Sequence, residues 1–140
     1  MKPSKTQIFL IILISMLILF FLAFSVYQEY QEQKTILVTS VIDGDTFEIE
    51  TGEKIRLICV DTPEINETGY EKAKIFLNSL SLNKKVRLEK DISDKDSYGR
   101  LLRYVYIDET FVNKEIVQTN LGVLFPFGND TKKCDEIEAG

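Results

Sequence analysis

The sequence predicts a five-stranded β-barrel with packed helices, preceded by one membrane-spanning helix. Three observations support this prediction: an uncharged apolar run near the N-terminus, five short segments of strand-like pattern after it, and two segments whose apolar residues recur at helical spacing. Alternation with a period of two is typical of strands, and a period of about 3.6 is typical of amphipathic helices. A length of 140 residues then allows one domain plus an appendage.

The N-terminal run covers residues 8–26 and contains no charged side chain. About 20 apolar residues are enough to cross the hydrocarbon core of a bilayer. Nothing in the run provides a solvent-facing polar side, which disfavours a core helix. A cleaved signal peptide is the alternative, because Ala23-Phe24-Ser25 has the small-x-small pattern of a cleavage site. The apolar core of such a peptide is usually only about 7–15 residues long, so the length favours an anchor.

Charge is distributed unequally on the two sides of this run. Lys2 and Lys5 precede it, whereas Glu29 and Glu32 follow it. Because positive charge stays on the cytoplasmic side, we expect the globular domain to lie outside the cytoplasm. If the segment is instead cleaved, the domain is secreted. The predicted organisation is a cytoplasmic N-terminus at 1–7, a transmembrane anchor at 8–27, a linker or helical stalk at 28–34 and the globular domain at 35–140.

The globular part is acidic and has few soft metal ligands. Residues 35–140 carry 14 Lys and Arg against 20 Asp and Glu, a formal net charge of −6. This disfavours a module that binds nucleic acid by charge alone, but a metal-dependent enzyme is less affected because its cation neutralises part of the site. Without histidine or a C-x-x-C pair, a zinc site is excluded. Cys59 is predicted to be a small core residue, and a disulfide to Cys134 would be permitted outside the cell.

The predicted elements of this domain follow one another in a simple order. Strands are predicted at 35–42, 46–50, 54–60, 86–91 and 101–107, and helices at 70–80 and 112–121. In the third strand Ile55, Leu57 and Cys59 should share one face, which leaves Arg56 on the other. Three strands, a helix, two strands and another helix suit a small barrel of the OB type.

Turns are predicted where glycine or proline occurs. Asp43-Gly44 is a strong hairpin signal, since glycine tolerates a positive φ. Pro63 disfavours helix at the residue before it and indicates a loop over 61–68. Gly122 is suited to end the last helix in a left-handed conformation.

Four segments combine residues suited to one kind of chemistry. Aspartate and carbonyl oxygens are ligands for Ca²⁺, and a carboxylate near a divalent cation can activate water without histidine. Arginine binds two phosphate oxygens and stays charged near neutral pH. This set suits phosphodiester hydrolysis in a chain that has no histidine. The segments are Asp43-Gly44-Asp45-Thr46, Ile55-Arg56-Leu57, Asp61-Thr62-Pro63-Glu64 and Ser97-Tyr98-Gly99-Arg100.

Each segment taken alone has an ordinary structural explanation. The two acidic motifs suit turns, and Glu64 suits a solvated loop. Arg56 could form a surface ion pair with Glu48 or Glu50. The joint occurrence of all four segments favours a catalytic site, within which Asp43 is expected to be a turn residue rather than a ligand.

The order of these segments and the residues within them resemble the staphylococcal nuclease (thermonuclease) family from about residue 38 to residue 117. The resemblance implies an OB-type barrel and a Ca²⁺-dependent endonuclease that acts on DNA and RNA and leaves 3′-phosphate ends. It also implies a role for each matching residue: Asp45 and Asp61 as calcium ligands together with the backbone carbonyl of Thr62, Glu64 as general base, Arg56 and Arg100 as phosphate-binding catalytic residues, and Tyr98 as a contact to the nucleotide.

The chain departs from the family pattern at several positions. Ser97 replaces a lysine that members with strong nucleotide binding carry, and Phe125-Pro126-Phe127 stands where they present tyrosines. Phenylalanine stacks on bases but cannot hydrogen-bond phosphate, so we expect weaker binding or a different preferred substrate. The loop over 62–70 is also shorter. Family members carry a longer final helix, so the C-terminal helix is expected to be truncated here.

Two other functions remain as alternatives. A non-catalytic OB-fold module on a membrane anchor would bind nucleic acid or protein, and it predicts the loss of an acidic or arginine motif residue, yet all are present. A structural anchor whose barrel binds a protein has no positive support. The expected partners of the enzyme are single-stranded nucleic acid or breathing duplex and the membrane, with no obligate protein partner.

Overall fold

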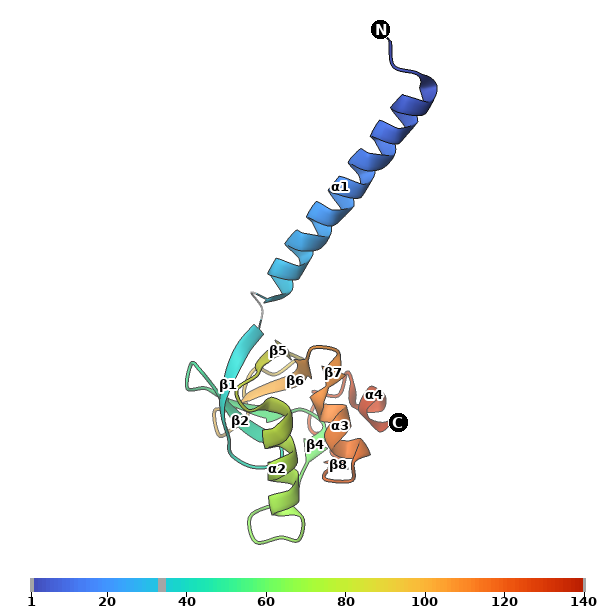
Figure 1. The fold of residues 1–140 in the computed structure, drawn as a ribbon. Helices are drawn as coiled ribbons and strands as arrows, with labels where there is room; N and C mark the ends of the chain where they lie inside the picture. Colours follow the sequence, from blue (N-terminus) through green and yellow to red (C-terminus); the bar gives the residue numbers. More distant parts are fainter. Residues whose placement is uncertain (1, 33–34, 140) are drawn as a thin grey trace. The chain divides into compact units, whose positions relative to one another are not determined.

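Helix α1 (Lys5–Glu32) forms the N-terminal unit of the computed structural model, which describes residues 2–32 and 35–139 (Figure 1). A capping box begins the helix: Gln7 N donates to Ser4 Oγ over 3.3 Å, and Ser4 N donates to Gln7 Oε1 over 2.8 Å. The segment Lys5–Gln28 is long and apolar enough to cross a membrane, but a signal sequence meets the same criteria. The predicted stalk is helical to Glu32, and its last two residues lie outside the described part.

The second unit, residues 35–140, contains a closed barrel of five strands. The strands run in the order β3-β2-β1-β5-β6, and β6 returns to pair with β3. The β3–β6 pair is parallel and the other neighbours are antiparallel. The OB-type prediction is confirmed. The barrel strands are β1 (Thr35–Val41), β2 (Thr46–Ile49), β3 (Lys54–Leu57), β5 (Lys85–Glu89) and β6 (Leu101–Ile107).

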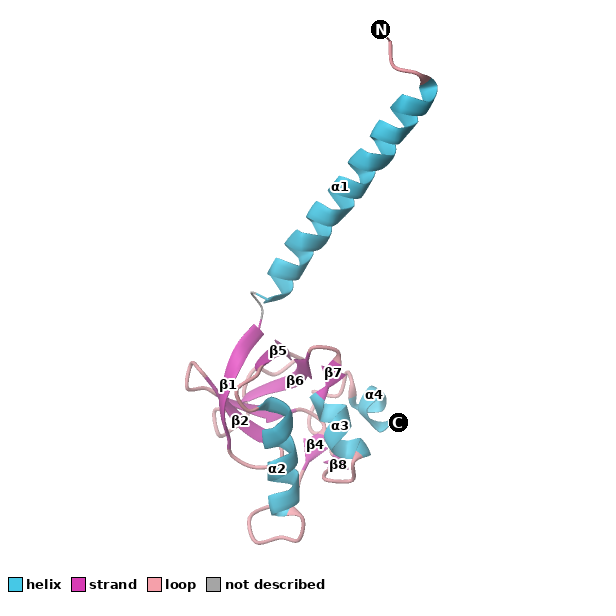
Figure 2. Cartoon of the chain, in the orientation of Figure 1, coloured by secondary structure: helices cyan, strands magenta, loops and turns pink. Residues whose placement is uncertain are grey.

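Three helices and three short strands complete this unit (Figure 2). Helix α2 packs on β1, and α3 packs on β6 and on α4. Strand β7 extends the sheet beyond β6, while β4 and β8 form a separate antiparallel pair. Both predicted helices are present, although the second ends at Gln118 rather than residue 121, and β7 and β8 were missed because each has only two residues. These elements are β4 (Val60–Asp61), α2 (Tyr70–Ser81), β7 (Thr110–Phe111), α3 (Val112–Gln118), β8 (Val123–Leu124) and α4 (Cys134–Glu138).

The barrel interior is filled from strands and helices together. Phe47 and Ile55 come from β2 and β3, Leu77 from α2 and Ile116 from α3, and all four are fully buried in one cluster. Burying one large apolar side chain contributes about 1.5–3 kcal/mol. The helices therefore supply a large share of the free energy that keeps the barrel closed.

A buried amide from α3 ties two strands together beside the closure. Asn113 accepts a hydrogen bond from Val105 N over 2.9 Å, and its Nδ2 donates to Ile58 O over 2.9 Å and to Arg103 O over 3.4 Å. The Asn113 side chain is fully buried, and leaving buried polar groups without hydrogen-bond partners there would be costly. Asn113 thus joins β6 to the turn that follows β3.

A second cluster lies at the C-terminal end of the fold. It contains Tyr104 and Phe111 from the barrel side and Ile137 from α4. A disulfide joins Cys59 to Cys134, 75 positions apart. Nothing in the sequence pattern predicted this bond, because the two cysteines come together only when α4 packs on the barrel. The disulfide fixes α4 to the turn between β3 and β4.

The third strand is shorter than predicted. It ends at Leu57 rather than residue 60, because the chain turns at Ile58 and Cys59. Cys59 adopts a positive φ of 60°, which no strand residue has. The predicted face that Cys59 would share with Ile55 and Leu57 therefore does not exist, and Cys59 instead belongs to the second cluster.

Two glycines act by their small size and not by a positive φ. Gly44 is absent from the residues with positive φ, and a Cβ there would lie 2.6 Å from Ala73 Cβ and 2.7 Å from Thr62 Oγ1. A Cβ on Gly122 would lie 2.9 Å from Asp61 O. The left-handed residue after α3 is Asn120, with a φ of 56°, so the predicted cap at Gly122 was wrong.

We predict that the disulfide makes a large contribution to stability. Replacing Cys59 and Cys134 together with alanine should lower the free energy of unfolding by about 3–5 kcal/mol, because the loop that the bond closes is long. Chemical unfolding of the full chain in detergent measures this loss. Adding reductant should destabilise the parent but leave the double variant unchanged. A loss below about 1 kcal/mol would show that apolar packing alone holds α4.

Candidate active site

The candidate site is a pocket of about 600 Å³ beside the closure of the barrel. Its walls come from β3, from the loop before β6 and from the segment that follows β8. Arg56 and Arg100 both line it, together with Tyr98, Phe125 and Phe127. Two predicted catalytic residues and the predicted nucleotide contact therefore share one concave surface.

Strand pairing explains why these side chains meet. Arg56 in β3 is paired with Thr46 in β2 on one side and with Leu102 in β6 on the other. Asp45 directly precedes β2, and Arg100 directly precedes β6. The two strands that flank β3 therefore bring the carboxylate of Asp45 and the side chain of Arg100 close to Arg56.

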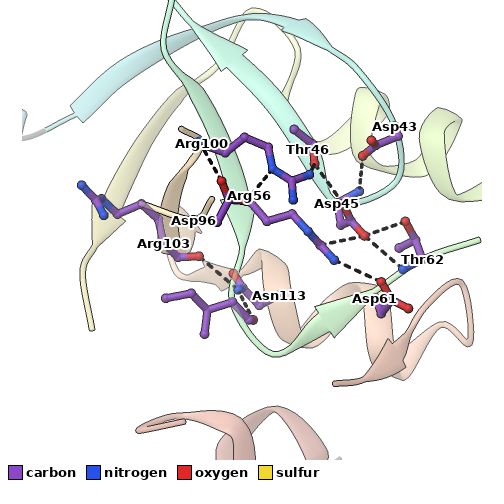
Figure 3. A network of polar contacts seen from close by, with 11 residues as sticks. Asp43, Asp45, Thr46, Arg56, Asp61, Thr62, Asp96, Arg100, Arg103 and Asn113 are labelled. Carbon is purple, nitrogen blue, oxygen red and sulfur yellow. Dashed lines mark hydrogen bonds and ion pairs between the residues drawn. The ribbon is translucent and has the colours of Figure 1, made fainter. Parts of the chain in front are cut away.

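Arg56 bridges two predicted metal ligands (Figure 3). Its Nη1 lies 2.7 Å from Asp45 Oδ2, and its Nη2 donates to Asp61 Oδ1 over 3.1 Å. The Nη1 contact is an ion pair without hydrogen-bond geometry. Among the described residues the ion pairs of Arg56 are with Asp45 and Asp61, and neither Glu48 nor Glu50 pairs with it. Both carboxylates therefore converge on one positive charge.

Asp45 is a buried carboxylate that accepts several hydrogen bonds. Its Oδ2 accepts hydrogen bonds from Thr62 N over 3.0 Å and Thr62 Oγ1 over 2.9 Å, and its Oδ1 accepts from Thr46 Oγ1 over 3.0 Å. Burial raises the pKa of Asp45 to about 6, although the charge of Arg56 lowers it, and the negative charge of Asp43 adds to the increase. Asp43 itself accepts from Asp45 N over 3.1 Å, which is the role of a turn residue.

Arg100 is held at two of its nitrogen atoms. Nε donates to Asp96 Oδ2 over 2.7 Å, and Nη1 donates to Thr46 Oγ1 over 3.4 Å. Since Thr46 also donates to Asp45, its hydroxyl joins the arginine side of the network to the carboxylate side (Figure 3). Asp96 and Thr46 were not among the predicted site residues. The four-residue spacing of Asp96 and Arg100 was visible in the sequence, whereas the contact of Thr46 depends on strand pairing.

Exposed aromatic rings stand around the two arginines. Tyr98 is 84% exposed, and the guanidinium of Arg100 lies 5.4 Å from its ring centroid. The rings of Phe125 and Phe127 are stacked with centroids 6.2 Å apart, and both are exposed. Rings in this setting offer flat faces on which bases can stack.

Glu64 lies apart from this network. Its side chain is exposed, and within the described part of the chain no hydrogen bond or ion pair joins its carboxylate to either arginine. Its backbone is well held, because Glu64 N donates to Glu67 Oε2 over 2.7 Å and Glu67 N donates to Glu64 O over 2.9 Å. The structure therefore orders the backbone of Glu64 without bringing its carboxylate into the polar network.

The oxygen atoms around Arg56 suit a hard cation. Asp45 and Asp61 already converge on a single positive charge, and the side chain of Asp61 is 44% exposed. Thr62 follows Asp61 and is hydrogen-bonded to Asp45, which keeps its backbone beside both carboxylates. Carboxylate and carbonyl oxygens are ligands for Ca²⁺. Among the described residues no cluster of three or more His, Cys, Asp or Glu side chains is present, so any ion here also needs carbonyl or water ligands.

We predict that the charge of Asp45 destabilises the ion-free fold at neutral pH. The pKa of Asp45 is raised from 3.8 to about 6, so its contribution is favourable in acid and is lost as the pH rises through 6. Asp45→Asn should stabilise the chain at pH 7.5 by on the order of 1–3 kcal/mol, and this gain should shrink towards zero below pH 4. Thermal unfolding in chelator at several pH values measures it. A less stable variant at pH 7.5 would mean that the pair with Arg56 outweighs burial.

Comparison with known proteins identifies relatives with nuclease names. The thermonuclease of Staphylococcus intermedius is 39% identical over 97 residues, covering 63% of this chain and 58% of the relative. The thermonuclease of Staphylococcus hyicus is 36% identical over 99 residues, covering 64% and 58%. Endonuclease YncB of Bacillus subtilis is 34% identical over 123 residues, covering 76% and 56%. The chain thus spans less than two thirds of the length of these relatives.

The family model described as staphylococcal nuclease homologue matches residues 54–139, more than half of the chain. This range contains both arginines, the loop that begins at Asp61 and the C-terminal wall of the pocket. The closed barrel agrees with the fold that the resemblance implied. The chain therefore belongs to the staphylococcal nuclease family.

Proposed function

We propose that this protein is a membrane-anchored, Ca²⁺-dependent endonuclease that hydrolyses DNA and RNA and leaves 3′-phosphate ends. The observation that carries the proposal is a pocket lined by two arginines and exposed aromatic side chains, in which Arg56 also contacts the carboxylates of Asp45 and Asp61. The thermonuclease and endonuclease names of the relatives support it. The retained site residues give no support to a non-catalytic module.

Each polar residue of the site has a distinct part in this reaction. Arg56 and Arg100 stabilise the negative charge that develops on the phosphate oxygens. Asp45, Asp61 and the carbonyl of Thr62 hold the Ca²⁺ ion, which supplies Lewis-acid chemistry when bound. Arg56 contacts the same two carboxylates that would hold the ion, so with these carboxylates on a cation its guanidinium would be available to phosphate.

Glu64 orients the attacking water and accepts its proton. The new bond forms between the water oxygen and phosphorus, and the bond to the 5′-oxygen breaks. The leaving 5′-oxygen takes a proton from solvent water, and Glu64 later returns to solvent the proton that it accepted. The bonds between Glu64 and Glu67 hold the backbone from which the carboxylate must reach the substrate. Because the Glu64 side chain is exposed, it can turn towards a bound phosphate without leaving a packed environment.

The preferred substrate is single-stranded nucleic acid or duplex that opens transiently. Tyr98, Phe125 and Phe127 present ring faces at the pocket, and base stacking contributes about 1–3 kcal/mol per base. The domain is acidic overall, which weakens long-range attraction to the dense charge of a duplex. Stacking therefore supplies more of the binding energy than phosphate contacts outside the pocket.

The location that we propose for the domain is outside the cytoplasm. The disulfide between Cys59 and Cys134 suits an oxidising compartment. The lysines before the apolar part of α1 and the glutamates after it favour the same orientation. An anchor agrees with the length of the apolar segment, and secretion after cleavage of a signal is the alternative.

We predict that activity requires both Ca²⁺ and the proposed catalytic residues. The full chain in detergent should cleave single-stranded DNA with Ca²⁺ and lose this activity in excess chelator. Arg100→Lys should lose the two-pronged phosphate contact, and Glu64→Gln should be unable to accept a proton. Each change should reduce turnover by about 10²–10³-fold with little effect on thermal stability.

Asp43→Asn is the matched control for this experiment. It alters a neighbouring acidic residue that caps the turn, so turnover should stay within a few-fold of the parent. Undiminished activity in chelator would contradict the metal assignment. Near-parental turnover of both Arg100→Lys and Glu64→Gln in saturating Ca²⁺ would contradict the catalytic roles.

We also predict that the barrel is accessible from outside the cell. Protease added to intact cells should digest the domain or release it, while a cytoplasmic marker protein stays intact. Immunoblotting for the barrel before and after permeabilisation measures this. Full protection until the membrane is opened would mean that the orientation is reversed.

A further inference from the structure

Asp96 is a pocket residue to which the proposed reaction gives no role. Its Oδ1 accepts hydrogen bonds from Tyr98 N over 2.9 Å and from Arg100 N over 3.0 Å. Its Oδ2 accepts from Arg100 Nε over 2.7 Å. One carboxylate therefore binds the main chain of two pocket residues and the side chain of one of them.

The backbone of Asp96 closes the same turn. Asp96 N donates to Arg100 O over 3.0 Å, and Gly99 N donates to Asp96 O over 3.1 Å. Gly99 has a φ of 81°, a conformation that favours glycine. The path of the chain through Tyr98 and Arg100 is thus built around one side chain.

The hydrogen bonds of Arg100 show which of its N–H groups remain available to a ligand. A guanidinium has five N–H groups. One on Nε is taken by Asp96, and one on Nη1 is taken by Thr46. Within residues 35–139 no protein acceptor contacts Nη2, so both of its hydrogens and one on Nη1 remain. One Nη2 hydrogen lies beside Nε–H, whereas the other Nη2 hydrogen and Nη1 form the end of the guanidinium, the edge suited to binding two phosphate oxygens.

We propose that Asp96 is a positioning residue that directs the Nη1–Nη2 edge of Arg100, and with it the ring of Tyr98, towards the substrate pocket. The inference rests on the proposed function, since it takes the ligand of that edge to be the phosphodiester of a single-stranded nucleic acid. Asp96 touches neither water nor phosphate in this role, and it acts through Arg100.

The charge state of Asp96 supports this role. Burial opposes ionisation, but hydrogen bonds from the side chain and backbone of Arg100 outweigh it and lower the pKa of Asp96. Charge-assisted hydrogen bonds are roughly twice as strong as neutral ones. The side chains of Asp96 and Arg100 are 16% and 27% exposed, so water competes little for the contact.

The variant Asp96→Asn should change the direction of the Arg100 side chain while keeping the shape of the turn. The amide oxygen can still accept from the two backbone N–H groups, so the turn persists. The amide nitrogen would face Nε, and because both are donors the guanidinium must turn away.

Asp94 provides a matched control on the same loop. Its Oδ1 lies 2.7 Å from Arg103 Nη2, so it also forms a close carboxylate–arginine pair. Its side chain is 53% exposed, and neither Asp94 nor Arg103 lines the pocket. Asp94→Asn therefore makes the same chemical change at a pair that does not face substrate.

The experiment measures cleavage of a single-stranded DNA oligonucleotide by the full chain in detergent with saturating Ca²⁺. Asp96→Asn should lower kcat about 10–100-fold with a smaller change in KM, while Asp94→Asn stays within about twofold. In an Arg100→Ala background, Asp96→Asn should have almost no further effect, because its partner is gone. An unchanged kcat for Asp96→Asn, or an equal loss with and without Arg100, would overturn the proposal.

A second measurement does not need activity. The NMR signal of the Arg100 Nε–H should shift in Asp96→Asn and stay unchanged in Asp94→Asn, with equal thermal stability of the two variants. If the parent chain cleaves no nucleic acid, the proposed function fails, and this signal still decides the position of Arg100. An Nε–H signal that is the same in Asp96→Asn as in the parent would overturn the role of Asp96.

Discussion

The parallel pairing of β3 with β6 is the constraint on which the rest of the structure depends. It closes the barrel, and it puts the start of β6 beside the middle of β3. Arg100 and Arg56 are separated by 43 intervening residues, yet they line one pocket because of this pairing. Asn113 in α3 reinforces the closure, because its buried amide hydrogen-bonds both to β6 and to the turn after β3. A shift of one residue in this register would turn Arg56 to the opposite face of the sheet.

The site concentrates charge where burial makes charge costly. Asp45 has its carboxylate oxygens satisfied by two threonines and one arginine, and its pKa is nevertheless raised. A structure selected for stability alone would gain from a neutral group here. In the proposed function this ionised carboxylate holds a hard cation, so stability and the proposed function conflict at Asp45.

The C-terminal part of the chain is held by a different set of forces. Helix α4 has only five residues, too few to be stable without tertiary contacts. A disulfide, the buried side chain of Ile137 and contacts from Lys133 to Tyr106 and Glu89 fix it to the barrel. The segment just before α4 forms one wall of the pocket. The bonds that stabilise α4 therefore also hold the exposed rings beside the arginines.

The sequence by itself determined the approximate positions of the five barrel strands along the chain, the two longer helices of the domain and the motifs that carry the charged residues. These are local properties, since alternation, helical spacing and turn residues depend on near neighbours. Only the tertiary structure decided that β3 ends at Leu57, that Cys59 pairs with Cys134, and that Gly44 and Gly122 are needed for their size. It also decided that Arg56 bridges Asp45 and Asp61 and that Thr46 connects Asp45 with Arg100. The geometry of these features is set by strand register, by turns and by helix packing, which local pattern does not specify.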